Sequence, residues 1–214
     1  MNARRTALVD SQRPDESIIS EAAELLRKGK VVVYPTDTIY ALGVNALAHE
    51  AIERLFAIKE RELNKPVHVV VDSLEMAEKY VVLNDAARQL AARFLPGPLT
   101  LILPKREVVP DILVGGQQTL GIRIPDNNVC LMLARSAGIP FTTTGANIAG
   151  GANPYTIDEA VNQLGPHIDQ VDLLIDQGPL AKRPPSTLID LTGSTPKILR
   201  DGPISADEIL RTIE

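Results

Sequence analysis

Short apolar runs, rich in β-branched residues and often closed by proline or glycine, alternate along this chain with segments whose apolar residues recur at helical spacing. Runs of this length are typical of buried strands rather than of core helices. The sequence therefore predicts a mixed α/β or α+β fold in which short strands form a twisted, mostly mixed sheet with flanking helices. The predicted strands fall near residues 30–34, 66–72, 99–104, 119–125, 140–144, 173–175, 186–191 and 197–200.

Residues that can cap a helix precede most of the predicted helices. The first helix is predicted from Glu16 to Gly29 and the second from His49 to about Lys59. Further helices are expected to begin after Ser73, Asn84, Asp126 or Asn127, Thr156 and Ser205. The last two are each followed three residues later by a glutamate, which completes a capping box.

The chain has 214 residues and a net charge of −5, from 22 Lys and Arg against 27 Asp and Glu. This length suits one domain, which we expect over residues 15–214 after a flexible N-terminal arm over residues 1–14. The acidic balance argues against strong non-specific binding to duplex nucleic acid, but it leaves room for a local basic pocket. One cysteine excludes an internal disulfide framework, and the scattered histidines show no metal-ligand spacing. No apolar run reaches the roughly 20 residues of a membrane helix, so we expect a cytoplasmic protein with no membrane partner.

A cluster of cations ends the second predicted helix. Lys59 lies seven residues after Ile52 and four after Leu55, so it continues their apolar stripe and is predicted to point into the fold. Together with Arg61 and Lys65 it would supply compact positive charge suited to a triphosphate. The alternative is a solvated helix end, in which the lysine stem follows the stripe and its amine stays in water.

Strand alternation gathers Thr119, Gly121 and Arg123 on one face of a predicted strand. An arginine beside a glycine and a hydroxyl leaves space for a carboxylate or phosphate above the sheet, although an exposed arginine has the same pattern. The small residues and hydroxyls of segment 142–151 offer donors to an anion, or form an ordinary polar turn. Cys130 is predicted to be a core residue, and His68, which alternates within a strand, is predicted to be structural.

Seven segments in chain order resemble motifs of the YrdC-like family. They are YPTDTIYALG, KERELNKP, PGPLTLIL, GIRIP, GANIAGG, PSTLID and ILRDG. The resemblance extends from about Glu16 to Gly202. Because the chain ends soon after the last motif, it resembles the single-domain form rather than the longer relatives.

The resemblance implies a sheet around a positively charged cavity and the activity of a threonylcarbamoyl-AMP synthase of the TsaC type, a nucleotidyltransferase. Such an enzyme converts L-threonine, bicarbonate and ATP into threonylcarbamoyl-AMP and pyrophosphate, for the threonylcarbamoyladenosine modification of tRNA. A downstream tRNA threonylcarbamoyl transferase complex would take the product, and tRNA itself would bind weakly. By motif position, threonine would contact Thr38, Arg123, Gly145 and Ser186. ATP would contact Lys59, Arg61, Lys65, Thr119, Asn147 and Arg200.

The chain departs from the family pattern at several positions. Many relatives have serine where this chain has Gly145 and Ala149, glycine at Ala41 and histidine at Val70. His68 is two residues from Val70, and the strand period of two places both on one face.

The implied reaction depends on positioning and charge neutralisation, because a carbamate oxygen attacks the α-phosphorus in line while pyrophosphate leaves. It needs no protein nucleophile. No acidic cluster in the sequence indicates a protein-held metal, so we expect Mg²⁺ to arrive on the ATP phosphates. The glycines of segment 144–154 predict a loop that closes over the labile adenylate.

Other functions stay open on the sequence alone. The main alternative is a tRNA or double-stranded RNA-binding module that uses the same basic cavity, which salt-dependent RNA binding without ATP consumption would favour. A second is an enzyme that makes a different carbamoyl adenylate, as the related domain of hydrogenase-maturation proteins does. A third is a regulatory nucleotide binder without turnover.

Overall fold

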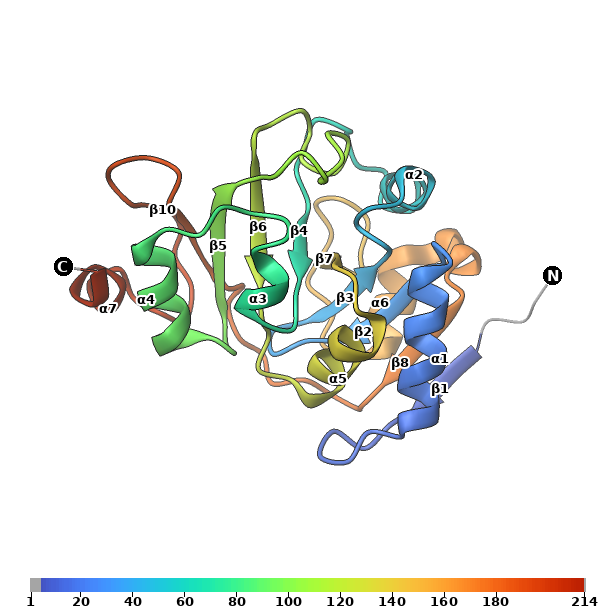
Figure 1. Ribbon diagram of the computed structural model, residues 1–214. Coiled ribbons are helices and arrows are strands. Elements are labelled where there is room, and N and C mark those ends of the chain that lie inside the picture. Colours follow the sequence, from blue (N-terminus) through green and yellow to red (C-terminus); the bar gives the residue numbers. More distant parts are fainter. Residues whose placement is uncertain (1–4, 214) are drawn as a thin grey trace.

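One twisted sheet of ten strands runs through the part of the chain that the computed structural model describes, residues 5–213 (Figure 1). The strands are Arg5–Leu8 (β1), Val32–Pro35 (β2), Tyr40–Gly43 (β3), His68–Val70 (β4), Leu99–Pro104 (β5), Thr119–Arg123 (β6), Phe141–Gly145 (β7), Leu173–Asp176 (β8), Thr187–Asp190 (β9) and Lys197–Arg200 (β10). Their order across the sheet is β1-β8-β2-β3-β7-β4-β6-β5-β9-β10, with both parallel and antiparallel neighbours. The predicted mixed sheet with flanking helices is confirmed.

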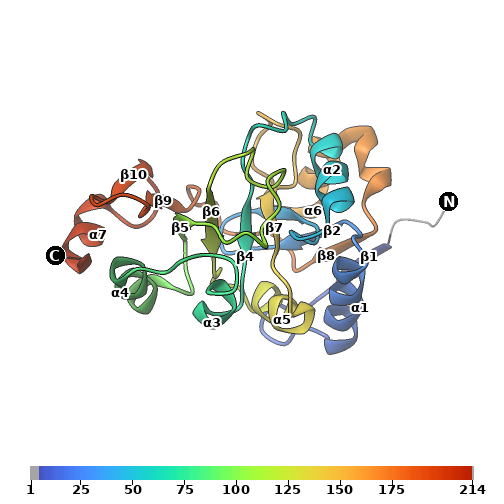
Figure 2. The ribbon, with the colours of Figure 1, turned by 45° about the horizontal axis from the view of Figure 1, so that its top comes forward.

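The helices are Glu16–Arg27 (α1), His49–Ile58 (α2), Leu74–Ala77 (α3), Asp85–Phe94 (α4), Asn128–Ala137 (α5), Ile157–Leu164 (α6) and Ala206–Ile213 (α7), with a 3₁₀ helix at Gly165–Gln170. Helices α1 and α5 lie side by side near one end of the sheet, and α4 and α7 lie together near the other end (Figure 2). None of the described helices is long and apolar enough to cross a membrane.

Side-chain caps begin most of these helices, as predicted. The side chains of Ser73, Asn84 and Asn127 accept hydrogen bonds from backbone N–H groups in the first turns of α3, α4 and α5. Of the two candidates before α5, the cap is therefore Asn127. Thr156 caps α6 in the same way.

Two strands escaped the sequence analysis. All four residues of β3 are buried, so no alternation of apolar and polar residues marks it as a strand. β1 lies within the segment predicted as a flexible arm, and that prediction is wrong for Arg5–Leu8, which pair in parallel with β8. β1 is an edge strand in which only Ala7 is buried, so its sequence lacks the apolar run that marks a buried strand. Residues 1–4 lie outside the described residues.

The central strands of the sheet determine where the functional site lies. β4 lies between β7 and β6, with His68 opposite Thr143 and Val69 opposite Ile122. The larger of two apolar cores contains residues of α2, α3, α4 and α6, and a smaller one lies under α1 and α5. Near the centre of the sheet, polar side chains of these strands and of the adjoining loops surround a cavity.

Candidate functional site

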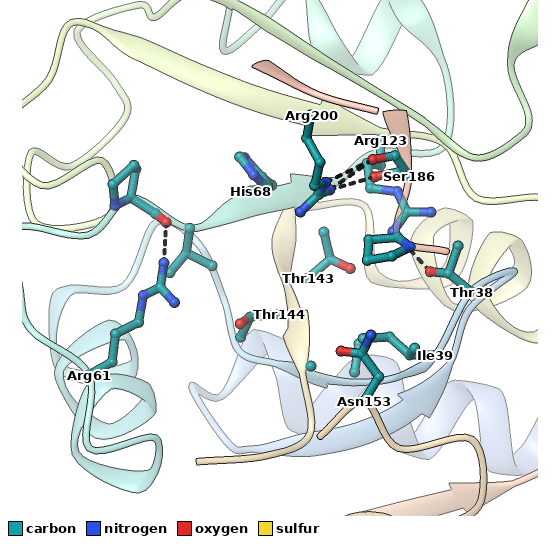
Figure 3. Close-up of a pocket in the computed structure, with 15 residues that line it drawn as sticks. Thr38, Ile39, Arg61, His68, Arg123, Thr143, Thr144, Asn153, Ser186 and Arg200 are labelled. Atoms are coloured by element: carbon teal, nitrogen blue, oxygen red, sulfur yellow. Dashed lines mark hydrogen bonds between the residues drawn. The ribbon is translucent and has the colours of Figure 1, made fainter. Parts of the chain in front are cut away.

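A cavity of about 210 Å³ opens over β3, β7, β4 and β6 (Figure 3). It brings together six of the residues that the sequence singled out, from positions as far apart as 38 and 200: Thr38, Arg61, Arg123, Gly145, Ser186 and Arg200. The sheet order explains this convergence, because strands distant in sequence become neighbours across the crossovers. The other four predicted residues, Lys59, Lys65, Thr119 and Asn147, do not line the cavity.

Arg123, at the end of β6, is buried and firmly held. Its Nη2 donates to Asp37 Oδ1 at 2.7 Å, and its Nη1 donates to Thr38 Oγ1 at 3.4 Å. The side chain of Asp37 is almost fully buried, and its other oxygen accepts from the backbone N–H of Asp126 at 3.3 Å. Among residues 5–213, Nε of Arg123 is buried and has no hydrogen-bond partner. One edge of this guanidinium is therefore fixed by a carboxylate, while Nε remains free to donate.

The turn between β2 and β3 presents the hydroxyl of Thr38. Thr36 Oγ1 accepts from the backbone N–H groups of Thr38 and Ile39 at 3.1 Å, and the two threonine hydroxyls are 3.1 Å apart. This turn explains why the segment after β2 lacks any regular period, since its side-chain oxygens take part in backbone hydrogen bonds. It places Thr38 beside Arg123 at one end of the cavity (Figure 3).

Ser186 and Arg200 form a second polar group at this end. Nε and Nη2 of Arg200 donate to the backbone oxygen of Ser186 at 3.0 and 2.9 Å, and Nη2 also reaches Ser186 Oγ at 3.1 Å. The Ser186 hydroxyl lies 2.7 Å from that of Thr100. Gly202 permits the close approach of these segments, because a Cβ there would lie 2.3 Å from the backbone nitrogen of Thr187. Burial, and then the charge of Arg123, lower the pKa of Arg200.

Arg61 lies at the opposite end of the cavity (Figure 3). The chain leaves α2 through Glu60, whose φ of 48° is in the left-handed region and turns the backbone sharply. Arg61 then donates from Nη2 to the backbone oxygen of Pro66 at 2.9 Å and from Nε to that of Lys65 at 3.2 Å. Burial lowers the pKa of the guanidinium. This end of the cavity offers a fixed positive charge.

Lys59 points into the fold, as the apolar stripe predicted, and is only 2% exposed. Its Nζ donates to the backbone oxygens of Gly145 and Asn147, both at 2.6 Å, and to Asn147 Oδ1 at 3.1 Å. Burial, followed by the charge of Arg61, lowers the pKa of Lys59 to about 7. The amine thus binds the loop after β7 rather than projecting into the cavity.

That loop is also held from within. Asn147 Nδ2 donates to the backbone oxygens of Gly151 and Ala152 at 2.9 and 3.0 Å. A Cβ on Gly145 would lie 3.0 Å from Asn147 Oδ1, so a side chain at this position would crowd the amide that holds the loop.

Lys65 and Thr119 are placed elsewhere. Lys65 is exposed and pairs with Glu62 at 3.0 Å. Thr119 is the first residue of β6 and lies opposite Pro104. It is at the other end of the strand from Arg123, with Gly121 between them. Lys65 shares a loop with Arg61, and Thr119 shares a strand face with Arg123, but neither lines the cavity. Sequence spacing alone could not separate these two residues from those that do line it.

Asp37 and His68 also contribute to this site, although neither was predicted as a binding residue. Asp37 is the carboxylate that holds Arg123, and its place between two threonines of the PTDT segment was the available signal. His68 was predicted to be structural, yet it lines the cavity, whereas Val70 packs in the smaller core with Cys130. Burial first, and then the charges of Arg200, Arg123 and Arg61, lower the pKa of His68 to about 4.

The described residues that line the cavity include three arginines and no aspartate or glutamate. Within residues 5–213 there is no group of three or more His, Cys, Asp or Glu side chains that could hold a metal ion. The arrangement can therefore bind an anionic ligand through arginines and hydroxyls, with the ligand's own groups as the source of any metal ligands.

Comparisons with known proteins agree on one family. A model of the Sua5, YciO and YrdC proteins, described as telomere recombination, matches residues 24–202. A threonylcarbamoyl-AMP synthase of Pyrococcus abyssi is 36% identical over 203 residues, which are 94% of this chain and 59% of the relative. A relative from Methanocaldococcus jannaschii is 38% identical over 192 residues, which are 88% of this chain and 89% of that protein.

A solved structure gives the same similarity in three dimensions. The crystal structure of P. abyssi Sua5 complexed with L-threonine matches with a TM-score of 0.92 and 36% identity, covering 98% of this chain and 61% of the Sua5 chain. This chain thus spans about three fifths of the longer Pyrococcus protein, and most of the shorter Methanocaldococcus one.

Proposed function

This chain belongs to the Sua5–YciO–YrdC family, and we propose that it is an L-threonylcarbamoyladenylate synthase, a nucleotidyltransferase that uses L-threonine, bicarbonate and ATP. The observation that carries the proposal is the convergence of Thr38, Arg61, Arg123, Ser186 and Arg200 on one cavity. These groups offer an amino-acid site at one end and a phosphate site at the other. A relative of the same fold is known in complex with L-threonine.

The amino-acid end is formed around Arg123. Its guanidinium would pair with the threonine carboxylate, because charge-assisted hydrogen bonds to a planar carboxylate suit arginine. Asp37 keeps the guanidinium in one orientation, so little conformational freedom is lost on binding. The hydroxyls of Thr38 and Ser186 lie within the same end and can recognise polar atoms of threonine.

The phosphate end is formed by Arg61, and Arg200, which is hydrogen-bonded to Ser186 at the other end, would also contact ATP. Arg61 is fixed by the backbone oxygens of Lys65 and Pro66 and faces the cavity. We place the ATP phosphates here, with Lys59 acting through the loop at Gly145–Asn147 instead of by direct contact. Contacts of ATP with Lys65, Thr119 and Asn147 remain predictions of the family resemblance.

The chemistry follows from this placement. The threonine amine and bicarbonate first give a carbamate with loss of water. A carbamate oxygen then attacks the α-phosphorus of ATP, the bond from that phosphorus to the bridging oxygen breaks, and pyrophosphate leaves. Fixed cations stabilise the charge that develops on the phosphoryl oxygens, and the cavity holds the two reactants in line.

We propose that Mg²⁺ arrives bound to the ATP phosphates, where it neutralises charge. The cavity offers arginines and hydroxyls, and the nearby carboxylate of Asp37 is already engaged by Arg123. The protein groups on the cavity wall therefore bind the phosphates rather than the metal ion.

The product would pass to a tRNA threonylcarbamoyl transferase complex. We also expect this chain to bind tRNA directly, but weakly. An acyl adenylate is labile in water, so transfer must be prompt. We expect synthesis and transfer of the adenylate to take place in the cytoplasm.

The test is pyrophosphate release from ATP by the purified chain, with and without L-threonine and bicarbonate. Release that requires both supports the synthase. Release without threonine indicates another adenylate-forming or hydrolytic activity. Salt-dependent RNA binding with no ATP consumption would support the RNA-binding alternative and overturn the proposal.

A further inference from the structure

His68 is one of two cavity residues, with Arg123, whose buried side-chain nitrogen lacks a partner among the described residues. Its Nδ1 is buried and accepts or donates no hydrogen bond among the described residues. The side chain comes from β4, opposite Thr143 of β7, and it lines the cavity. A buried polar atom without a partner is uncommon in native proteins and calls for a physical explanation.

Gly121 of the neighbouring strand β6 explains where Nδ1 points. A Cβ added to Gly121 would lie only 2.1 Å from Nδ1, so the imidazole occupies the space that a side chain would take. The glycine carries a hydrogen along that same direction, and this hydrogen points toward Nδ1. A C–H group can act as a weak donor to a lone pair, whereas an N–H on Nδ1 would have no acceptor there. The contact therefore favours the tautomer with its proton on Nε2.

The imidazole stays neutral in this setting. Three arginines of the cavity, Arg200, Arg123 and Arg61, act against a positive charge on the ring, and burial acts in the same direction. A neutral ring with its single proton on Nε2 is a hydrogen-bond donor at that nitrogen.

The position of the ring is between the two ends of the cavity. In Figure 3, His68 lies between Arg61 on one side and the group of Arg200, Ser186 and Arg123 on the other. The carbamate and the α-phosphoryl group must meet between the amino-acid end and the phosphate end, since they are the parts that react.

We infer that His68 is a substrate-contacting residue whose Nε2–H donates to an anionic oxygen of the reacting group, with Gly121 holding the ring in place. This inference rests on the proposed function, because it takes the two ends of the cavity as the sites of threonine and ATP. The acceptor is an oxygen of the carbamate or of the α-phosphoryl group. A neutral donor here stabilises developing negative charge without placing a fourth cation among three arginines.

Nuclear magnetic resonance of the ¹⁵N-histidine-labelled chain tests the assignment without relying on turnover. The protein has only three histidines, at positions 49, 68 and 167, so their signals can be assigned by single substitutions. We expect His68 to show the neutral Nε2–H tautomer between about pH 5 and 8, a range in which an ordinary histidine changes its charge. We also expect its Nε2 signal to shift when ligands bind.

Separate additions identify the acceptor. One sample receives L-threonine with bicarbonate, a second receives an ATP analogue with a methylene bridge between the α- and β-phosphorus atoms, and a third receives all of these. A shift with threonine and bicarbonate alone assigns the carbamate side, and a shift with the analogue alone assigns the phosphoryl side. An unchanged Nε2 signal in the third sample, with analogue binding shown by calorimetry, overturns the inference.

Substitutions test the same contact through pyrophosphate release. His68→Leu should lower kcat by about 10²-fold, the cost of removing one preorganised donor, while KM for ATP changes little. His68→Gln can place its amide N–H near the position of Nε2 and should recover part of the loss, whereas His68→Asn should not. The exposed His49→Gln is the matched control and should behave as the wild type.

Gly121→Ala tests the supporting contact, because its Cβ would displace the ring. If Gly121→Ala lowers kcat by displacing the His68 ring, it should lower kcat little further in a protein that already carries His68→Leu. Equal kcat in His68→Leu and the wild type, with unchanged melting temperatures, contradicts the inference. Absence of threonine-dependent turnover in the wild type would count against the proposed function, while the resonance experiment with the ATP analogue would still decide the role of His68.

Discussion

At the scale of single residues, the charged groups of the cavity are fixed by protein partners before a ligand binds. Arg61 and Arg200 donate to backbone oxygens, and Arg123 donates to Asp37. Because these side chains are already held in one conformation, ligand binding costs little side-chain entropy. Sequence spacing predicted Arg61 and Arg123 because each has a local pattern. It missed Asp37 and the cavity position of His68, because both depend on contacts between strands distant in sequence.

Replacing Arg61 by alanine should weaken ATP binding about 10- to 150-fold, the range that corresponds to losing a hydrogen bond to a charged group worth about 1.5–3 kcal/mol. Calorimetric titration with ATP measures the change. Lys28→Ala removes an exposed cation that pairs with Glu24, far from the cavity, and should leave the dissociation constant unchanged. Wild-type affinity in a folded Arg61→Ala protein would show that the phosphates bind elsewhere.

His68 should make the protein sensitive to acid. Its pKa is lowered to about 4 in the folded chain, while an unfolded histidine titrates near 6.5. Between these values the unfolded chain binds more protons, so the free energy of unfolding falls as the pH drops, by up to about 3 kcal/mol in total. Urea unfolding over this pH range should give a flatter profile for His68→Gln than for the wild type. Parallel profiles for the two proteins would mean that the folded chain protonates this ring as readily as the unfolded one.

At the scale of elements, helix α2 and the loop after β7 form one unit through Lys59. Besides the three hydrogen bonds from Nζ, the backbone oxygen of Lys59 accepts from the N–H of Ala149 at 2.8 Å. The apolar period of α2 predicted an inward lysine, and helix caps predicted most helix starts, because both signals are local in sequence. The strands β1 and β3 were missed, since one is an edge strand of mixed polarity and the other is buried on both faces.

Lys59→Met should loosen this loop, because methionine keeps an apolar stem and removes all three donors to the loop. Hydrogen exchange should show faster exchange over residues 145–152, with the first turns of α2 unchanged. Loss of the anchor should also weaken ATP binding through the loop. If amide protection in this loop equals that of the wild type, Lys59 is not its anchor.

At the scale of the whole molecule, the cavity is assembled by the crossovers of a single ten-stranded sheet. Its lining residues come from Thr38 to Arg200, so almost the whole chain must fold to form it. Fold class followed from the alternation of strands and helices in the sequence. Strand order did not, because it depends on pairings between distant segments such as β1 with β8.

Removing residues 1–9 should lower stability without abolishing chemistry. β8 would lose its parallel partner β1, and the buried side chains of Ala7 and Val9 would be lost from the smaller core. For a domain of this size, each 1 kcal/mol lost lowers the melting temperature by about 2–4 °C, so a decrease of several degrees is expected. Pyrophosphate release at low temperature should persist, because residues 5–9 are not among the residues that line the cavity. An unchanged melting temperature would mean that β1 adds no stability.

The most direct measurement of the central claim is the identity of the nucleotide product. The purified chain is incubated with ATP, Mg²⁺, L-threonine and ¹³C-bicarbonate, and the adenylates are analysed by mass spectrometry. The account predicts threonylcarbamoyl-AMP that carries the ¹³C label. It predicts little product with L-alanine, because a buried polar group left without its hydroxyl partner costs about 1–3 kcal/mol. Absence of a labelled threonylcarbamoyl adenylate, from protein that binds ATP and threonine, would contradict it.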